Sequence, residues 1–593
     1  MSFNELLIIF ALAIFALIML LLWWVRKDSN QKNLTVKQRP RWFFSVYCAA
    51  AAVFFLFSAY SVLVGSRPLI WFLSFALLGT LALYFADSPT SRHRRFSIAL
   101  VVLLAVLESS IPMIQNMGVV INSDQWRDLR VTTYIVDEGT FQNAPGLGTG
   151  YYSFIPLFNV LNAGISEMAG WPAMTTFTFL QFILPLISTL SIYAIVKRLT
   201  GQVQASIIAV MLYSSIPRLS NVQVVPSTIG ISLGFLLILL LVKENLSSFR
   251  NIVPVVAMLA FAVNVFHPVG MIPVLAICLG TIVISRLPFG RDLSTQAIST
   301  TWRVFGICVL VTLTYWMADS RVFTGVFNPI IRLVHIFTSA SEAHPSLYKP
   351  QYQGSGFEIF SFAWALPVAL SAAYAIWILI NTRKDTWSKQ DSSQHVITVA
   401  AFAGLLLILS AFASVLISPG GGLEKYLNIP AYGLLLLPSA FVFGRFLSSN
   451  KKIPVVCAVL LLSAMVVIGS RSPDWAPFEN PSFGAFRSTA TSLVEANTLV
   501  TLVPNGTRLY EDYDIPLEEV APLQDIIFTT DRNYDTTRKV VQMFEGNLFG
   551  SFDEDYRGAL IVMKTDRIVN GEVLTVYINI VYSSGRHIVV VGL

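Results

Sequence analysis

Residues 96–113 read FSIALVVLLAVLESSIPM, and the stretch NSDQWRDLR follows at residues 122–130. A helix needs about 20 mostly apolar residues to cross a hydrocarbon core of roughly 30 Å, and the first stretch comes close to that length. The second stretch places two carboxylates and two guanidiniums soon after this span. The two stretches together predict a membrane helix that ends at a charged segment facing water and lipid headgroups.

Apolar segments of this kind recur along the whole chain. Its 593 residues are 55% hydrophobic and 12% charged, with a mean hydropathy of +0.66, a composition that excludes a soluble multidomain protein. We predict a polytopic α-helical membrane protein with about fourteen spans, near residues 6–25, 43–65, 68–86, 96–113, 173–196, 203–216, 227–242, 252–266, 269–285, 303–318, 358–380, 396–417, 428–446 and 453–470.

The orientation of these spans follows from basic residues, because Lys and Arg gather in short cytoplasmic loops. Every second connection, starting with the loop after the first span, carries such residues, among them Arg26, Lys27, Arg92, Arg94, Arg95, Lys197, Arg198, Lys243, Arg286, Arg383, Lys384, Lys451 and Lys452. We therefore expect a multi-pass cell-membrane protein of a prokaryote whose N-terminus, outer loops 114–172 and 319–357, and C-terminal segment lie outside the cytoplasm.

Charge and cysteine content exclude several function classes. The net charge of +6 reflects cytoplasmic loops beside anionic lipid, so no nucleic-acid partner is expected. The four cysteines all fall inside predicted spans, which leaves no disulfide framework or metal-thiolate spacing; they are Cys48, Cys278, Cys308 and Cys457. No Walker loop is present, so ATP-driven transport is not supported.

The first outer loop is expected to contain two surface elements. Residues 124–138 have no Pro or Gly and predict a short interfacial helix, on which Asp124 and Asp128 lie four residues apart on one face. The aromatic and apolar run 151–165 is too short to span and is predicted to lie along the membrane surface. The second outer loop, 319–357, either covers a site at the membrane boundary or merely connects helices.

Beyond residue 470 the pattern changes from spans to short strands. Alternating or β-branched runs predict strands at 499–503, 525–529, 559–563, 573–581 and 587–591, with helices at 485–496 and 536–544 between them. The segment 471–593 is therefore expected to form a small extracytoplasmic α+β domain, long enough to hold its own core.

A resemblance to a known superfamily rests on several motifs of the first outer loop and the spans that follow it. The quoted stretches are 124–128 (DQWRD), 135–141 (IVDEGTF), 150–157 (GYYSFIPL), 165–170, 193–201, 215–218 (SIPR) and 225–230 (VPSTIG). Over roughly residues 96–450 this pattern resembles the GT-C superfamily, integral-membrane glycosyltransferases that use polyprenyl-phosphate-linked sugars. The resemblance implies a GT-C-like catalytic domain at 96–470, preceded by a three-helix membrane extension at 1–95.

By this resemblance Asp124 is a general base that deprotonates the acceptor hydroxyl, or a metal-binding acid, and Asp128 is a supporting carboxylate. Glycosyl transfer needs a carboxylate near the acceptor oxygen and cations near the departing phosphate. Arg127 and Arg130 either meet the lipid phosphate or pair with the two aspartates. Arg218 is a further candidate for the phosphate.

The triplet Glu424-Lys425-Tyr426 before a late span looks like one that many superfamily members carry, usually with Arg in place of Lys425. Lysine can hold a phosphate as a point charge, which makes Lys425 the fourth candidate for the donor phosphate.

Other residues are candidates to line the same cavity. Glu108 is the clear acid within a span, and His267 occupies a predicted outer turn. The full set of cavity candidates is Glu108, His267, Glu424, Tyr151 and Tyr152. The second catalytic group stays open among Asp128, Glu108, His267 and Glu424.

We therefore expect a glycosyltransferase of hexosyl or pentosyl units that works at the outer face of the membrane. Its partners would be a polyprenyl-phosphate-linked sugar donor, a protein, lipid or glycan acceptor, and membrane lipids. A divalent metal, Mg²⁺ or Mn²⁺, held by Asp124 and Asp128 stays open as a cofactor. The alternatives are a secondary transporter or a lipid or glycan flippase, whose charged loop would only gate, and a non-catalytic assembly or receptor protein.

Overall fold

The computed structural model describes residues 41–64, 69–86, 88, 90–115, 123–142, 144, 157–216, 225–242, 249–286, 295–318, 361–381, 392–417, 423–447, 455–456, 459–467, 508–511, 527–528, 560–564, 578–583 and 587–592. The chain divides into two compact units. We call them the bundle unit, Met1–Gln115, Gly148–Leu161 and Phe179–Asp474, and the second unit, Asn116–Leu147, Asn162–Thr178 and Trp475–Leu593.

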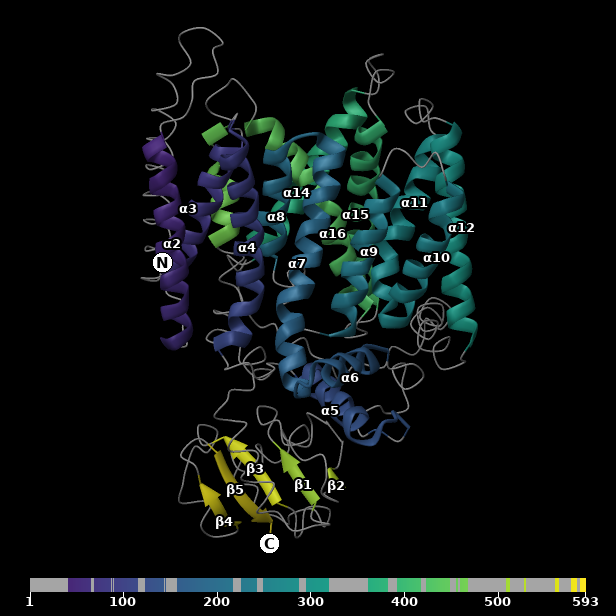
Figure 1. The fold of residues 1–593 in the computed structure, drawn as a ribbon. Helices are drawn as coiled ribbons and strands as arrows, with labels where there is room; N and C mark the ends of the chain where they lie inside the picture. The colour runs from purple at the N-terminus through teal and green to yellow at the C-terminus, as the bar shows by residue number, and fades with distance from the viewer. Residues whose placement is uncertain are drawn as a thin grey trace. The chain divides into compact units, whose positions relative to one another are not determined.

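The bundle unit consists of apolar helices that run side by side (Figure 1). Six helices in the described part are long and apolar enough to cross a membrane, and five shorter ones are apolar as well. The helices are α2 (Arg41–Val64), α3 (Leu69–Ala86), α4 (Ser91–Gln115), α7 (Ala173–Thr200), α8 (Val203–Ser214), α9 (Pro226–Val242), α10 (Phe249–Phe266), α11 (Met271–Arg286), α12 (Thr295–Ala318), α14 (Ser361–Asn381), α15 (Ser392–Ile417) and α16 (Leu423–Leu447), with the 3₁₀ turn η3 (Pro268–Gly270) before α11.

These helices coincide with the predicted spans from 43–65 to 428–446, so the chain is a multi-pass α-helical membrane protein. Several helices are longer than the apolar runs that predicted them; α12, for example, begins at Thr295 and not at 303. The predicted span 6–25 lies outside the described residues, and 453–470 is described only in part. The predicted total of fourteen spans therefore stays a prediction.

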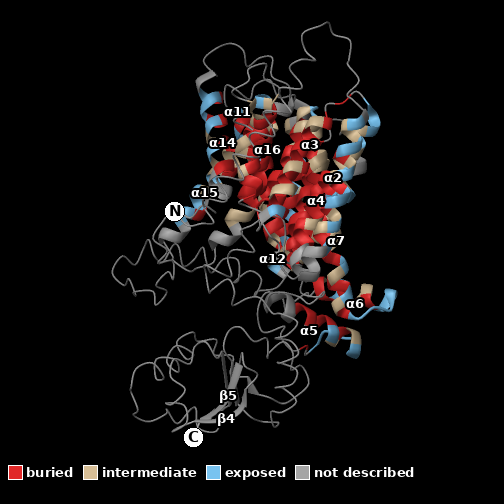
Figure 2. Ribbon diagram, turned by 90° about the vertical axis from the view of Figure 1, so that its left-hand side faces the viewer, coloured by how far each residue is buried: buried red, intermediate tan, exposed pale blue. Residues whose placement is uncertain are grey.

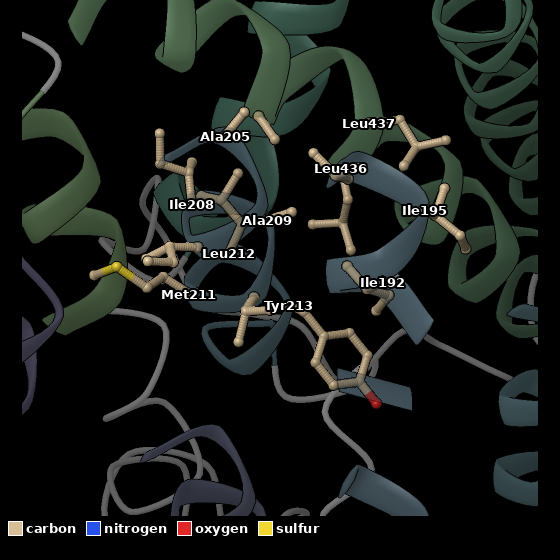
Figure 3. Packing of buried hydrophobic residues seen from close by; sticks show 14 of the residues in the cluster. Ile192, Ile195, Ala205, Ile208, Ala209, Met211, Leu212, Tyr213, Leu436 and Leu437 are labelled. Carbon is tan, nitrogen blue, oxygen red and sulfur yellow. The ribbon is translucent and has the colours of Figure 1, made fainter. Parts of the chain in front are cut away.

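The core of the bundle lies around α8. Each residue from Ala205 to Ser214 is buried, as expected of a helix that is apolar on all sides. Figure 2 shows the buried residues concentrated inside the bundle, with exposed ones on its outer flanks. Figure 3 shows side chains of α8 beside those of α7 and α16, with Ile192, Ile195, Ala205, Ile208, Ala209, Met211, Leu212, Tyr213, Leu436 and Leu437 labelled.

One crossing in the bundle brings two backbones into direct contact. A Cβ atom at Gly234 would overlap the carbonyl of Gly270, and one at Gly270 would overlap the carbonyl of Gly230. A Cβ at Gly230 would lie 2.7 Å from the carbonyl oxygen of His267. Small residues are what allow membrane helices to approach this closely, so α9 and η3 depend on these three glycines.

A pair of hydrogen bonds joins α4 to α7. The Gln181 side-chain amide donates to the Ser109 backbone carbonyl at 2.7 Å. The Ser110 hydroxyl shares its one proton between the Val106 carbonyl of its own helix at 2.8 Å and the Gln181 backbone carbonyl at 3.1 Å. Gln181, Ser109 and Ser110 are all buried. Because a span offers few other partners for polar groups, these bonds fix how the two helices pair.

We expect Gln181→Leu to lower the free energy of unfolding by about 1 kcal/mol, the usual scale of an interhelical hydrogen bond in a membrane. Thermal unfolding of the purified protein in lipid nanodiscs would measure this loss. Leu190→Ala is the matched control, since Leu190 lies on the same helix with 46% of its surface exposed. Equal unfolding temperatures for the two variants would contradict the expected role.

The described strands of the C-terminal segment form one five-stranded mixed sheet. Its order is β2-β1-β3-β5-β4, with β1 parallel to β2 and β3, and β5 antiparallel to β3 and β4. A bulge interrupts the β4–β5 pairing between Ile580 and Tyr582. The strands are β1 (Arg508–Glu511), β2 (Ile527–Phe528), β3 (Leu560–Lys564), β4 (Ile578–Ser583) and β5 (His587–Gly592).

Four of the predicted strands correspond to β2, β3, β4 and β5, but β1 was missed. Its sequence, RLYE, has charge at both ends and only two central residues that favour a strand, so its periodicity is too short to recognise. The predicted strand at 499–503 and the predicted helices at 485–496 and 536–544 lie outside the described residues. The domain boundaries and the extracytoplasmic α+β domain therefore stay predictions.

Candidate functional site

Helix α5 (Ser123–Glu138) carries the charged stretch that follows α4. The absence of Pro and Gly lets the helix form, and Gly139 ends it in a left-handed conformation with φ of 66°, where glycine avoids the penalty of a Cβ. The Gly139 N–H donates to the Ile135 carbonyl at 2.9 Å. The predicted helix at 124–138 is thus confirmed.

One face of α5 is buried, and it is partly polar. Asp128, Val131, Thr132 and Ile135 are at most 8% exposed, and their spacing places them on a single side of the helix. By contrast, Thr133, Asp137 and Glu138 are exposed. The apolar part of this face, together with Ala144, packs against Ala163 of α6 (Leu157–Ala169), so α5 and α6 are in contact.

Asp128, one of the candidate catalytic residues, is buried. Its side chain is only 2% exposed, and a carboxylate can be buried only where partners offset the loss of hydration. One turn later the Thr132 hydroxyl donates to the Asp128 backbone carbonyl at 2.7 Å, which commits that hydroxyl proton to the helix itself. The buried face of α5 thus contains one enclosed acid, Asp128, which lies one helical turn after Asp124.

On helix α6 several polar side chains are buried and several apolar side chains are exposed, the reverse of what is usual in a globular protein. Its buried side carries Asn159, Asn162 and Ser166, which are at most 3% exposed. Its exposed side carries the apolar residues Val160 and Leu161, both 37% exposed, and Met168, 83% exposed, beside one exposed acid, Glu167. Trp171, 39% exposed, follows the helix. This distribution suits a helix lying in the headgroup region of a bilayer, and span α7 begins only four residues after α6 ends.

We expect a nitroxide label on Met168→Cys, in a variant whose native cysteines are replaced, to be accessible to oxygen and shielded from a polar nickel relaxation agent. The physical reason is that oxygen partitions into lipid, whereas the nickel complex stays in water. Electron paramagnetic resonance of the protein in vesicles would measure both accessibilities. Glu138→Cys, at an exposed acidic position of α5, is the control and should show the opposite pattern; equal accessibilities at both sites would contradict an interfacial α6.

Two candidate residues belong to the bundle unit and are buried there. Glu108 on α4 is 4% exposed and precedes the two serines at the α4–α7 crossing. His267 is 5% exposed in the turn between α10 and η3, where its Nδ1 accepts the N–H of Val269 at 3.2 Å. An accepting Nδ1 carries no proton, so the imidazole proton is on Nε2. This ring caps η3, which is the structural role of a turn histidine.

The remaining candidates are located only in part. Asp124, Arg127 and Arg130 lie on α5, within two turns of one another, and Glu424 and Lys425 lie in the first turn of α16; the side chains of all five are outside the description. Tyr151, Tyr152 and Arg218 lie outside the described residues altogether. The structure thus brings the two aspartates and two arginines together on one helix.

Sequence reasoning missed the buried polar face of α6. The signal was present, because Asn159, Asn162 and Ser166 recur at intervals of three and four residues within an otherwise apolar run. Such spacing puts the three on one side of a helix. It was overlooked because the run was interpreted by its apolar residues alone.

The described residues contain no group of three or more His, Cys, Asp or Glu side chains able to hold a metal ion. Asp124 is outside that search because its side chain is not described. No step of the chemistry proposed below depends on a metal.

No family model matches the chain, and no curated protein is significantly similar to it. Among solved structures, the chain is similar to ArnT from Cupriavidus metallidurans bound to undecaprenyl phosphate, with 12% identity, coverage of 85% of this chain and 99% of ArnT, and a TM-score of 0.44. The apo state of that protein aligns with 11% identity, coverage of 84% and 98%, and a TM-score of 0.42.

The Archaeoglobus fulgidus oligosaccharyltransferase in the apo form is similar with 12% identity over 80% of this chain and 70% of that one, and a TM-score of 0.46. Both proteins are GT-C glycosyltransferases. At 11–12% identity and TM-scores below 0.5, these similarities assign this chain neither a family nor an activity.

Proposed function

We propose that this chain is a membrane glycosyltransferase that moves a sugar from a polyprenyl-phosphate donor to an acceptor at the outer face of the membrane. The observation that carries the proposal is helix α5, where the enclosed carboxylate of Asp128 follows Asp124 by one turn. The resemblance of residues 96–450 to GT-C glycosyltransferases supports the same activity. Glycosyl transfer needs a carboxylate near the acceptor oxygen, and α5 carries two carboxylates soon after a span.

In the proposed reaction Asp124 accepts the proton of an acceptor hydroxyl. The acceptor oxygen forms a bond to the anomeric carbon of the sugar while the bond from that carbon to the phosphate oxygen breaks. The polyprenyl phosphate leaves with the bonding electrons, so cations near it lower the barrier. Arg127 and Arg130 of α5, with Arg218 and Lys425, are the proposed sources of that charge.

Asp128 has a supporting role in this scheme. Because it is almost fully enclosed, it is poorly placed to exchange protons with solvent, and its charge is felt strongly by nearby groups at low local dielectric. We propose that it holds the arginines of α5 in position. The acceptor is a protein, lipid or glycan hydroxyl.

The proposal is tested by incubating purified full-length protein with radiolabelled polyprenyl-phosphate hexoses and pentoses and with acceptors from a membrane extract. We expect one donor class to give labelled product together with free polyprenyl phosphate in equal amount. Heat-denatured protein is the control. The absence of transfer with every donor would overturn the proposal, and movement of intact donor across vesicles would favour a flippase in its place.

A further inference from the structure

Asn162 lies on the buried face of α6, and in the described part of the chain its side chain has no hydrogen bond. Its side chain is 0% exposed, and within the described part of the chain neither its amide oxygen nor its amide nitrogen has a partner. Burying an amide without partners costs free energy, and such orphaned groups in native structures call for an explanation. A bound group that supplies both a donor and an acceptor would provide one.

Two other buried hydroxyl groups of this region are satisfied by the protein itself. The Ser166 hydroxyl shares a hydrogen bond of 2.7 Å with the hydroxyl of Thr176, and the Thr132 hydroxyl is committed to its own helix. The next residue, Ala163, packs against the Val131 and Ile135 side of α5, the face that also carries Asp128. Asn162 is therefore the sequence neighbour of the α6 residue that contacts this face of α5.

The hydrogen-bond donors and the acceptor of the Asn162 side chain limit which chemical groups can satisfy it. Its nitrogen offers two donors and its oxygen accepts. A phosphate has only acceptors, so it would satisfy the nitrogen and leave the oxygen orphaned. A sugar hydroxyl both donates and accepts, so two neighbouring hydroxyls can accept one amide N–H and donate to the amide oxygen at the same time. We infer that Asn162 binds a hydroxyl of the transferred sugar and so positions its anomeric carbon; this inference rests on the proposed glycosyl transfer.

The decisive experiment combines Asn162→Leu with altered donors. The donor found active on the wild-type protein is compared with its 2-, 3-, 4- and 6-deoxy forms, and kcat and KM are measured for each. We expect one deoxy position to lower wild-type kcat/KM by about 10- to 100-fold, the scale of losing one or two hydrogen bonds. In Asn162→Leu that position should make no further difference, whereas the other deoxy positions should behave as they do in the wild type.

Stability gives a second, independent measurement. Asn162→Leu removes an unpaired buried amide, so its unfolding temperature should equal or exceed that of the wild type while sugar transfer falls. Thr189→Val is the matched control, because the Thr189 hydroxyl on α7 is also fully buried without a hydrogen bond in the described part. That control should be equally stable and fully active. If Asn162→Leu does not fold, Asn162→Ala takes its place in the same comparison.

Two results would overturn the inference without touching the proposed function. One is unchanged kinetics in Asn162→Leu, as expected if the amide binds only a buried water molecule. The other is an equal loss from every deoxy donor in the variant and the wild type. If the wild-type protein transferred no sugar at all, that result would instead contradict the proposed function, on which the inference depends.

Discussion

Asp124→Asn is expected to reduce sugar transfer by about 10²- to 10⁴-fold, the usual contribution of a general base, while the protein keeps its fold. Asparagine retains the size and the hydrogen-bonding oxygen of the aspartate but cannot accept a proton at neutral pH. The loss should therefore fall on kcat, with KM for the donor changed little. The measurement is initial rates with the active donor at saturating acceptor.

Two companion variants separate the roles of the acids on α5. Asp128→Asn should also reduce transfer, but it removes a charge from a site that is 2% exposed, so it should change the unfolding temperature as well. Glu138→Gln is the control at the exposed end of the same helix and should be fully active. If Asp124→Asn retained wild-type kcat while Asp128→Asn lost it, the base would have to be assigned to Asp128.

The membrane helices could be predicted from the sequence because a helix satisfies all of its backbone hydrogen bonds within one segment, as a bilayer requires. Backbone polar groups inside a bilayer must be satisfied within the segment, so long apolar runs become helices, as α7 and α15 show. Helix α5 was also foreseen, since a stretch without Pro or Gly ended at Gly139. In these cases the local pattern alone decides the structure.

The buried polar groups of the site could not be predicted, because burial depends on which faces meet. The spacing of Asn159, Asn162 and Ser166 puts them on one face of a helix, but no local pattern shows whether that face, or Asp128, is enclosed. Ala163 packs against Val131 and Ile135, and this contact joins segments that are separated in sequence by a turn-rich stretch. The strand β1 was missed for a different reason, because its four residues, RLYE, are too few for a strand periodicity to be recognised.

Gly270→Ala is expected to have the largest effect on the stability of the bundle. A methyl group there would overlap the backbone carbonyl of Gly230 and would come within 2.9 Å of the Val263 side chain. Overpacking typically costs about 1–3 kcal/mol, occasionally more, and a carbonyl cannot rotate away as a side chain could. We therefore expect a loss of about 3 kcal/mol, seen as a lower unfolding temperature and a smaller monodisperse yield.

The matched control for this prediction is Gly306→Ala on α12, where an added Cβ would meet no atom within 4 Å. Alanine favours a helix over glycine by about 0.5–1 kcal/mol, so this variant should be neutral or slightly more stable. Gly234→Ala, which faces the Gly270 carbonyl, should behave like Gly270→Ala. Because His267 accepts the Val269 N–H within the same turn, displacing η3 would also move that imidazole. Equal unfolding temperatures for Gly270→Ala and Gly306→Ala would show that the backbone contact between α9 and η3 does not hold the two elements together.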